Sequence, residues 1–329
     1  MKINWYLLIF LLSLSLGFLS IQKAARITHL PDYFPKMIVP AGNEMNKTRI
    51  QLGKLLFFDK RLSIDESISC SSCHKPELAF ADNLPVTPGV EGRLGNRNAP
   101  TLTNVGYNPV YLFDGFLETL EKQAVVPIEE HAEMAFNIVE ITKRFASNKQ
   151  YQKLAQKAYN RNLDPFVITR ALATFQRSLI SYQSKYDQVL LGKDKFSETE
   201  KKGMDLFFNQ LKCTECHAGF NFTNFSTQNN GLYENYIDSG RMRVTKNEMD
   251  RDLFKVPTLR NVALTAPYMH DGSISTLEDV IKHYEKGGLP NKNKSIHVQP
   301  FIISNEDRDN LIQFLNTLTD DKFVKRHSN

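Results

Sequence analysis

Two copies of one short cysteine motif constrain this chain more than any other feature of its sequence. Each copy reads C-x-x-C-H, with Cys70, Cys73 and His74 in the first and Cys213, Cys216 and His217 in the second. The motif is typical of covalent haem c attachment, in which both thiols bond to the haem and the histidine is the proximal iron ligand. A zinc site favours closer cysteine pairs, and a redox dithiol does not need the histidine. Because the motifs use all four cysteines, the sequence predicts two haem c groups and no disulfide.

The first residues have the pattern of an export signal. Lys2 is followed by an apolar run from Trp5 to Leu19. A positive charge before such a run is typical of a secretory signal, and the run is short for a transmembrane helix, which needs about 20 apolar residues. We predict a signal peptide at residues 1–20, either cleaved or retained as an N-terminal anchor. Since haem c is attached outside the inner membrane, we also predict a periplasmic protein.

The net charge of the chain gives little information about the class of partner that it binds. It has 41 basic and 36 acidic residues, a formal net charge of +5. This excess is mild and spread along the chain, so it does not indicate binding to nucleic acid. A weak preference for an acidic protein partner is the most that it supports.

A repeated phrase precedes each haem motif. Gly53–Phe58 leads to the first and Gly203–Phe208 to the second, and both place Leu-Phe-Phe three residues after the glycine. Ser197 and Glu200 have the spacing of a capping box, which predicts a helix start before the second phrase. A glycine within a helix costs stability, so we expect each of these glycines to permit a close helix crossing.

An amphipathic helix is also predicted to close each half of the chain. Asp164-Pro165 is a helix cap followed by proline at the first helical position, and Ser304 with Asp307 begins another helix. A helix before the haem and a closing helix are the plan of a small cytochrome c domain. The sequence therefore predicts a mainly α protein of two cytochrome c-like haem domains, at residues 21–190 and 191–329, with long loops and few short strands.

The sixth iron position separates an electron carrier from an enzyme. A carrier fills this position at both haems, whereas a peroxidase leaves one open. After His74 the next histidine is His131, and no methionine lies between them. The first haem therefore lacks an obvious second ligand nearby in sequence. The segment Glu129–Met134 is rich in glutamate, and a carboxylate can move a proton between the two oxygens of peroxide.

Five phrases of the chain are specific enough to suggest a family. They are Arg97–Thr101 (RNAPT), Phe113–Gly115 (FDG), Leu120–Ala124 (LEKQA), Phe254–Val262 (FKVPTLRNV) and Ala266–Ser273 (APYMHDGS). These phrases resemble the bacterial dihaem cytochrome c peroxidases and their relative MauG, the maturation enzyme of methylamine dehydrogenase. The resemblance runs from about Gly53 to Thr319.

The resemblance implies an active site at the first haem. Peroxide would bind above His74, and the family's active-site glutamate, which precedes a methionine, falls on Glu133. The family's upstream glutamine and proline fall on Gln123 and Pro127. Electrons would arrive through the His217 haem from a small periplasmic cytochrome c or cupredoxin.

The resemblance also implies a calcium ion between the two domains. In the family an asparagine side chain and backbone carbonyls of a Thr-x-Pro segment bind it, and the matching residues are Asn98, Thr265 and Pro267. Oxygen ligands suit calcium. Family members are commonly dimers, although nothing in this sequence indicates such an interface.

The chain departs from the family pattern at two places near the first haem. The loop 87–93 lacks the histidine that in many of these peroxidases blocks the iron until the second haem is reduced. We therefore expect an iron that is open in the resting state. Phe113 occupies the position of the family's tryptophan between the haems. Because phenylalanine is much harder to oxidise, hole hopping through this position is disfavoured.

A third departure concerns the second haem, whose sixth ligand is methionine in the peroxidases. The family spacing from Thr265 arrives at Tyr284, and MauG has tyrosine there. An anionic oxygen ligand should lower the haem potential relative to methionine. Met269 and His283 are the alternatives, and His270 is expected to lie beside the haem without binding iron.

Together these features predict an exported dihaem c-type peroxidase that reduces hydrogen peroxide to water. A MauG-like oxidase of a partner protein is the alternative. Tyr284 favours it, whereas the absence of tryptophan after Trp5 opposes it, because remote oxidation needs hopping residues. A plain electron carrier is a third reading, and the missing sixth ligand after His74 argues against it.

Overall fold

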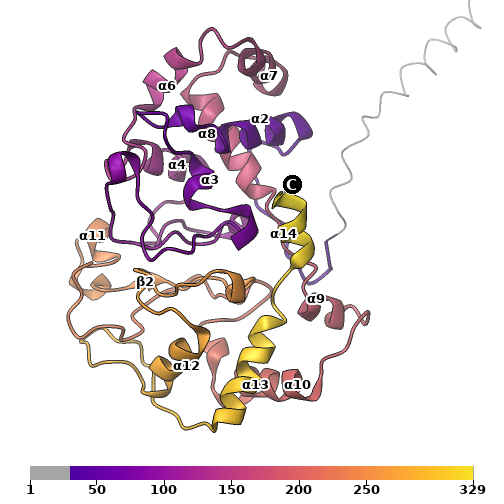
Figure 1. The fold of residues 1–329 in the computed structure, drawn as a ribbon, viewed down its shortest axis with the longest axis vertical. Helices are drawn as coiled ribbons and strands as arrows, with labels where there is room; N and C mark the ends of the chain where they lie inside the picture. Colours follow the sequence, from indigo (N-terminus) through magenta and orange to yellow (C-terminus); the bar gives the residue numbers. More distant parts are fainter. Residues whose placement is uncertain (1–29, 329) are drawn as a thin grey trace, which may run out of the picture. The chain divides into compact units, whose positions relative to one another are not determined.

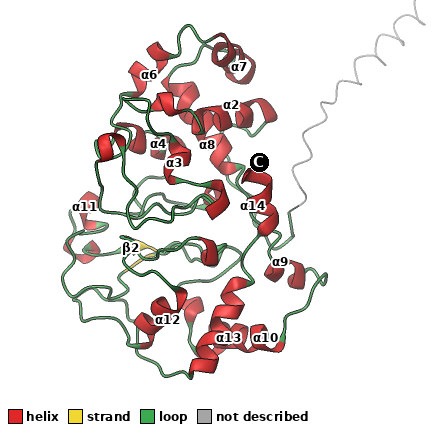
Figure 2. Cartoon of the chain, in the orientation of Figure 1, coloured by secondary structure: helices red, strands yellow, loops and turns green. Residues whose placement is uncertain are grey.

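The computed structural model describes residues 30–328, and the predicted signal segment and Trp5 lie outside this range. The described chain is mainly helical with long connecting loops, as the sequence predicted (Figure 2). Its strands form one two-stranded antiparallel sheet, in which Thr227 pairs with Lys255 and Gln228 with Phe254. Within residues 30–328, no helix combines the length and apolar character needed to cross a membrane.

The helices and strands have the following bounds: α2 Lys47–Phe57, α3 Cys70–Cys73, α4 Leu120–Gln123, α5 Val126–Glu129, α6 Ile138–Arg144, α7 Lys149–Tyr159, α8 Pro165–Arg177, α9 Lys185–Leu190, α10 Glu198–Asp205, α11 Met242–Thr245, α12 Leu277–Glu285, α13 Asn305–Asn316, α14 Asp321–Ser328, β1 Thr227–Gln228 and β2 Phe254–Lys255. Short 3-10 turns lie between them, among them η2 Pro76–Leu78, η3 Val90–Gly92, η6 Cys213–Glu215 and η8 Val262–Leu264.

The predicted caps begin the predicted helices. The Asp164 side chain accepts from the Val167 amide at the start of α8. Ser197 forms a complete capping box with Glu200 at the start of α10. These caps satisfy amide groups that the first helical turn leaves without partners.

The second phrase does not stay α-helical to its end. The helix that begins after the Ser197 capping box, α10, ends at Asp205 and is followed by a π-helical turn at Leu206–Gln210. The adjacent rings of Phe207 and Phe208 both pack against Phe222 and Phe314. Successive residues of an α-helix point about 100° apart, so the wider turn lets both rings face the same neighbours.

The two repeat glycines sit where helices cross at close range. A Cβ added to Gly53 in α2 would lie 1.9 Å from the Ala171 carbonyl oxygen of α8. A Cβ added to Gly203 in α10 would lie 1.9 Å from the Asn310 carbonyl oxygen of α13. Figure 1 shows both helix pairs, α2 with α8 and α10 with α13. The expected close crossings are confirmed.

The apolar core consists of two clusters. One draws on residues between Leu52 and Leu179, and the other on residues between Leu206 and Leu318. The C-terminal helix α14 joins the first cluster, because Phe323 is fully buried there and its ring packs at a tilt against Phe80, with centroids 5.9 Å apart. The predicted domain boundary at residues 190 and 191 stays a prediction.

Candidate functional site

Both C-x-x-C-H motifs have the same local design. The first forms the short helix α3 and the second forms η6, and in each the histidine amide donates to the carbonyl of the first cysteine. His74 Nδ1 lies 3.0 Å from the Phe80 carbonyl oxygen, and His217 Nδ1 lies 3.2 Å from that of Phe222. A carbonyl partner makes Nδ1 the protonated nitrogen and leaves Nε2 with a lone pair.

The surroundings of these histidines favour the neutral imidazole that binds iron. Burial lowers the pKa of His74, and it lowers the pKa of His217 to about 4. Two thiols three residues apart, followed by an imidazole with a free Nε2, are the donor set that haem c requires. The residues present at both motifs therefore fit a covalently bound haem.

Glu133 lies beside the first motif. Burial raises the pKa of the Cys70 and Cys73 thiols, and the charge of Glu133 adds to both shifts. The Glu133 side chain keeps an exposed face. Burial of its carboxyl group, followed by the charge of Glu130, raises its pKa to about 7. A carboxyl group with this pKa can both accept and return a proton near neutral pH.

The loop 87–93 forms hydrogen bonds and close contacts with the segment that carries Glu133. The Val90 amide donates to the Glu133 carbonyl oxygen at 2.9 Å. Arg93 Nη1 lies 3.1 Å from the His131 carbonyl oxygen and 3.2 Å from His131 Nδ1. His131 therefore bonds to this loop. Because Gly89 packs on the Ala132 and Glu133 carbonyls, where a Cβ would lie 2.1 Å from the Ala132 oxygen, the contact requires glycine.

The other residues assigned to the first haem lie on two short helices. Gln123 ends α4, and its Oε1 is buried without a hydrogen-bond partner among the described residues. A buried hydrogen-bond acceptor without a partner destabilises the folded protein, and a bound water or peroxide could donate a hydrogen bond to it. Pro127 lies in α5, and its carbonyl accepts from the Met134 amide at 3.1 Å.

Two candidate ligands for the second haem converge on Asn230. Asn230 Nδ2 lies 3.1 Å from Met269 Sδ. Burial raises the pKa of Tyr284, and the charges of Cys216 and Cys213 raise it further. A hydrogen bond with the Asn230 side chain lowers it. Tyr284 therefore lies close to the second motif. The third candidate, His283, has its Nε2 3.0 Å from the Asn230 carbonyl oxygen.

Sequence reasoning missed Asn230. The asparagines around it resemble those of any polar loop, and only the folded chain brings this one to Met269 and Tyr284. His270, expected beside the haem, stacks on Phe254 with ring centroids 3.9 Å apart.

Phe113 lies at the junction between the two halves of the chain. Its carbonyl oxygen accepts from the Lys255 amide of β2 at 2.7 Å. The neighbouring Asp114 is fully buried and binds Arg97 at 2.7 Å and Arg243 at 2.6 Å. Burial lowers the pKa of Lys255 to about 8, and no charged partner within residues 30–328 opposes this shift. An anionic group such as a haem propionate would suit it.

Asn98 also bridges the junction. Its amide donates to the His270 carbonyl oxygen at 2.7 Å, and its Nδ2 donates to the carbonyls of Leu84 at 3.0 Å and Pro85 at 3.2 Å. It therefore lies beside the segment that contains Thr265 and Pro267. In the described chain no group of three or more His, Cys, Asp or Glu is arranged to hold a metal ion. A calcium ion here would depend on amide and carbonyl oxygens, which are acceptable calcium ligands.

Comparisons with known proteins agree on one family. Residues 47–195 match the family described as di-haem cytochrome c peroxidase. The chain is 36% identical over 320 residues to a cytochrome c551 peroxidase of Nitrosomonas europaea, covering 95% of this chain and 91% of that protein. It is 33% identical over 292 residues to the methylamine utilization protein MauG of Methylophilus methylotrophus, covering 88% and 86%. A crystal structure of a MauG-like protein associated with microbial copper homeostasis is 34% identical with a TM-score of 0.85, covering 90% and 96%.

Proposed function

The chain belongs to the di-haem cytochrome c peroxidase family, and from this premise we propose that it is a periplasmic enzyme that reduces hydrogen peroxide to water. Membership implies two haem c groups, which would be held by Cys70, Cys73 and His74 and by Cys213, Cys216 and His217. The proposed electron donor is a small periplasmic cytochrome c or cupredoxin. The observation that carries the proposal is the position of Glu133, an acid–base group beside the first motif.

The residues of the protein contribute to the reaction mainly by transferring protons and orienting peroxide. Haem iron bound at His74 would supply the redox chemistry that breaks the O–O bond. Glu133 takes the proton from one peroxide oxygen and returns it to the other, so that the departing oxygen leaves as water. The buried Gln123 Oε1 accepts a hydrogen bond from peroxide or water and orients it. Overall, one peroxide takes up two electrons and two protons and gives two waters.

Steady-state kinetics test the proposal. The holoprotein is mixed with reduced cytochrome c, and cytochrome oxidation is followed after addition of hydrogen peroxide. Immediate turnover without prior reduction of the second haem is expected, because loop 87–93 carries no histidine. Turnover that begins only after prereduction would contradict the open resting site, and no turnover at all would contradict the peroxidase function.

A MauG-like oxidase of a partner protein is the second candidate. The position of Tyr284 close to the second motif favours it, because a tyrosinate ligand lowers the haem potential. Burial raises the pKa of this phenol, so the anionic form requires a compensating cation such as ferric iron.

Tyr284→Met is expected to raise the reduction potential of the second haem by on the order of 0.1 V, because a thioether favours ferrous iron. Spectroelectrochemical titration measures the shift, and the methionine–iron absorption band should appear in the variant. Met269→Leu is the control, and it should leave the oxidised spectrum unchanged. If Met269→Leu removes a methionine–iron band from the wild-type spectrum, Met269 is the ligand and the Tyr284 assignment fails.

We also propose a calcium site at Asn98 and the carbonyls of Thr265 and Pro267. Calcium should raise the thermal unfolding midpoint of the protein, since a ligand at about 100 times its Kd stabilises the folded state by about 2.7 kcal/mol. Asn98→Ala should abolish this calcium-dependent rise. The exposed Asn96 provides a matched control, and Asn96→Ala should retain it. Equal calcium responses in both variants would refute the site.

A further inference from the structure

A tyrosine lies next to the ligand candidates of the second haem. The Tyr236 hydroxyl accepts from the Leu232 amide at 2.7 Å, and its own hydrogen is shared between Asn229 Oδ1 at 3.2 Å and Asn230 Oδ1 at 3.3 Å. Asn230 also contacts Met269 Sδ. Burial raises the pKa of Tyr236 to about 12, and the charge of Tyr284 contributes to the shift. Tyr236 is therefore a protonated phenol that contacts Asn230, the residue that also contacts the ligand candidates Met269 and Tyr284.

A second tyrosine continues from Tyr236 towards solvent. The ring centroids of Tyr233 and Tyr236 are 5.3 Å apart in an edge-to-face arrangement. The Tyr233 hydroxyl donates to Asp271 Oδ2 at 2.6 Å. Tyr233 and Asp271 are half-buried, and the Tyr233 phenol is less buried than that of Tyr236. The pair therefore runs from the pocket to the protein surface.

The chemistry of phenols suits this arrangement. Tyrosine is far easier to oxidise than phenylalanine, and the one tryptophan of the chain, Trp5, lies outside the described residues. Removal of one electron makes a phenol strongly acidic, so its proton must have an acceptor nearby. The Asp271 carboxylate, already hydrogen-bonded to Tyr233, is such an acceptor.

We propose that Tyr236 and Tyr233 conduct oxidising equivalents from the second haem pocket to the surface, where Tyr233 oxidises phenolic donors that are too large to enter a haem pocket. This inference rests on the proposed peroxidase function, which supplies hydrogen peroxide as the oxidant. It adds a site of substrate oxidation at Tyr233, away from both haem motifs.

Atoms and electrons balance in this scheme. One electron passes from Tyr233 into the haem pocket by way of Tyr236, whose phenol keeps its own proton against the amide oxygens of Asn229 and Asn230, and the Tyr233 proton passes to Asp271 Oδ2. The neutral Tyr233 radical then takes one electron from the phenolic donor and its proton back from Asp271. Each donor loses one electron and releases one proton. Two such cycles deliver the two electrons that, with two protons, reduce one peroxide to two waters.

Radical trapping followed by peptide mass spectrometry tests the proposal. The holoprotein is treated with hydrogen peroxide and the spin trap DMPO without an added reductant. We expect an adduct on Tyr233, and we expect Tyr236→Phe to abolish it, because phenylalanine does not relay the electron. The oxidised haem spectrum of Tyr236→Phe is recorded as well, and it should match the wild type, which shows that the haem ligands are intact. Tyr233→Phe should lower the turnover of 2-methoxyphenol.

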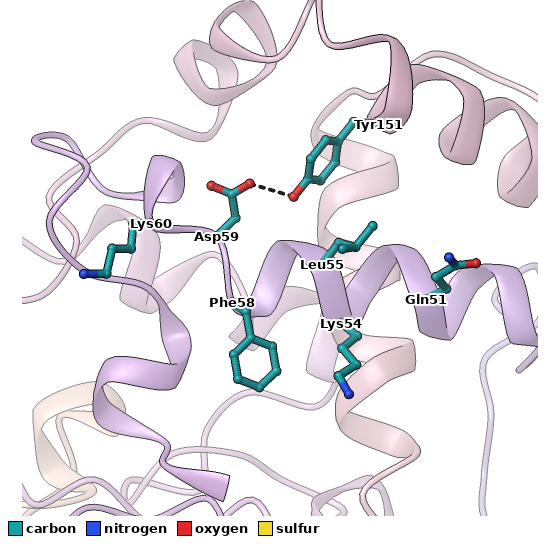
Figure 3. A pocket seen from close by; sticks show the side chains of 7 residues that line it. All are labelled: Gln51, Lys54, Leu55, Phe58, Asp59, Lys60 and Tyr151. Carbon is teal, nitrogen blue, oxygen red and sulfur yellow. Dashed lines mark hydrogen bonds between the residues drawn. The ribbon is translucent and has the colours of Figure 1, made fainter. Parts of the chain in front are cut away.

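Tyr151 provides a matched control on the other half of the chain. Its hydroxyl also donates to a carboxylate at 2.6 Å, that of Asp59, in an open pocket of about 480 Å³ (Figure 3). Within residues 30–328 its one ring-to-ring contact is with Phe145, so no aromatic pair connects it to the second motif. Tyr151 should carry no adduct, and Tyr151→Phe should leave the Tyr233 adduct unchanged.

The outcomes separate this inference from the proposed function. If peroxide changes neither haem spectrum, the peroxidase function and the inference both fail. If the spectra change but Tyr233 stays unlabelled, only the inference fails. Undiminished labelling of Tyr233 in Tyr236→Phe, or equal labelling of Tyr151 and Tyr233, would also overturn it, because either result means that the radicals arrive from solution.

Discussion

Replacing Glu133 with glutamine is expected to lower peroxide turnover by about 10²- to 10⁴-fold, the usual contribution of a positioned acid–base group. Glutamine keeps the size of the side chain but cannot carry a proton between the peroxide oxygens. Both haem spectra of the oxidised protein should remain those of the wild type, because Glu133 is not an iron ligand. Stopped-flow mixing with hydrogen peroxide and steady-state oxidation of cytochrome c measure the loss. Unchanged turnover would refute the proposed mechanism.

The pH profile adds a sharper test of the same residue. Glu133 must be ionised to accept a proton, and its pKa is about 7. Wild-type turnover should therefore fall as the pH drops below about 7, and this acid limb should be absent from Glu133→Gln. The exposed Glu130 offers a control, because its charge contributes to the raised pKa. Glu130→Gln should retain turnover and shift the acid limb to lower pH. An acid limb that stays in place would mean that another group titrates.

Gly53→Ala is expected to destabilise the protein by at least about 3 kcal/mol, at or above the usual cost of overpacking. Alanine is the better helix former by about 1 kcal/mol, so an ordinary helical site would be stabilised. Here the new methyl group would lie 1.9 Å from the Ala171 carbonyl oxygen, which belongs to the backbone of α8 and cannot rotate away. Gly203→Ala should behave in the same way against Asn310 in α13.

Urea unfolding of the holoproteins measures these differences in free energy. Gly95→Ala is the matched control, since a Cβ there would meet nothing within 4 Å and the residue is exposed. It should change the free energy of unfolding little. If Gly53→Ala were as stable as the wild type, α2 and α8 would not pack as closely as described.

Local signals in the sequence predicted the helices well. Caps such as Asp164 and Ser197 act within one turn, so their partners are visible in the sequence itself. The repeat also indicated the close crossings at Gly53 and Gly203. Glycine within a helix lowers stability, so its presence at the same place in both phrases suggests a contact that only glycine permits. No local signal in the sequence marks the π-helical turn at Leu206–Gln210, where Phe207 and Phe208 both contact Phe314, far along the chain.

The candidate site was predictable only where its residues belong to a motif. The six haem-attachment residues have fixed spacing, whereas Asn230, Met269 and Tyr284 are brought together by long loops. No periodicity or spacing links Asn230 to the other two. The same holds for the Tyr233–Asp271 hydrogen bond, whose partners are far apart in the chain. Sequence reasoning therefore predicted the haem attachment points and named Met269 and Tyr284 as candidate ligands, but it did not predict that Asn230 lies between them.

The position of α14 has a consequence for the biogenesis of the protein. Phe323 and His327 from this helix pack on Phe80, with ring centroids 5.9 Å and 5.4 Å away. The carbonyl of Phe80 holds His74. A ribosome makes the residues around the first haem motif well before α14, so the pocket behind His74 stays incomplete until α14 has been made. Haem attachment at the first motif before α14 is made would thus act on an unfinished pocket, and α14 would close it afterwards.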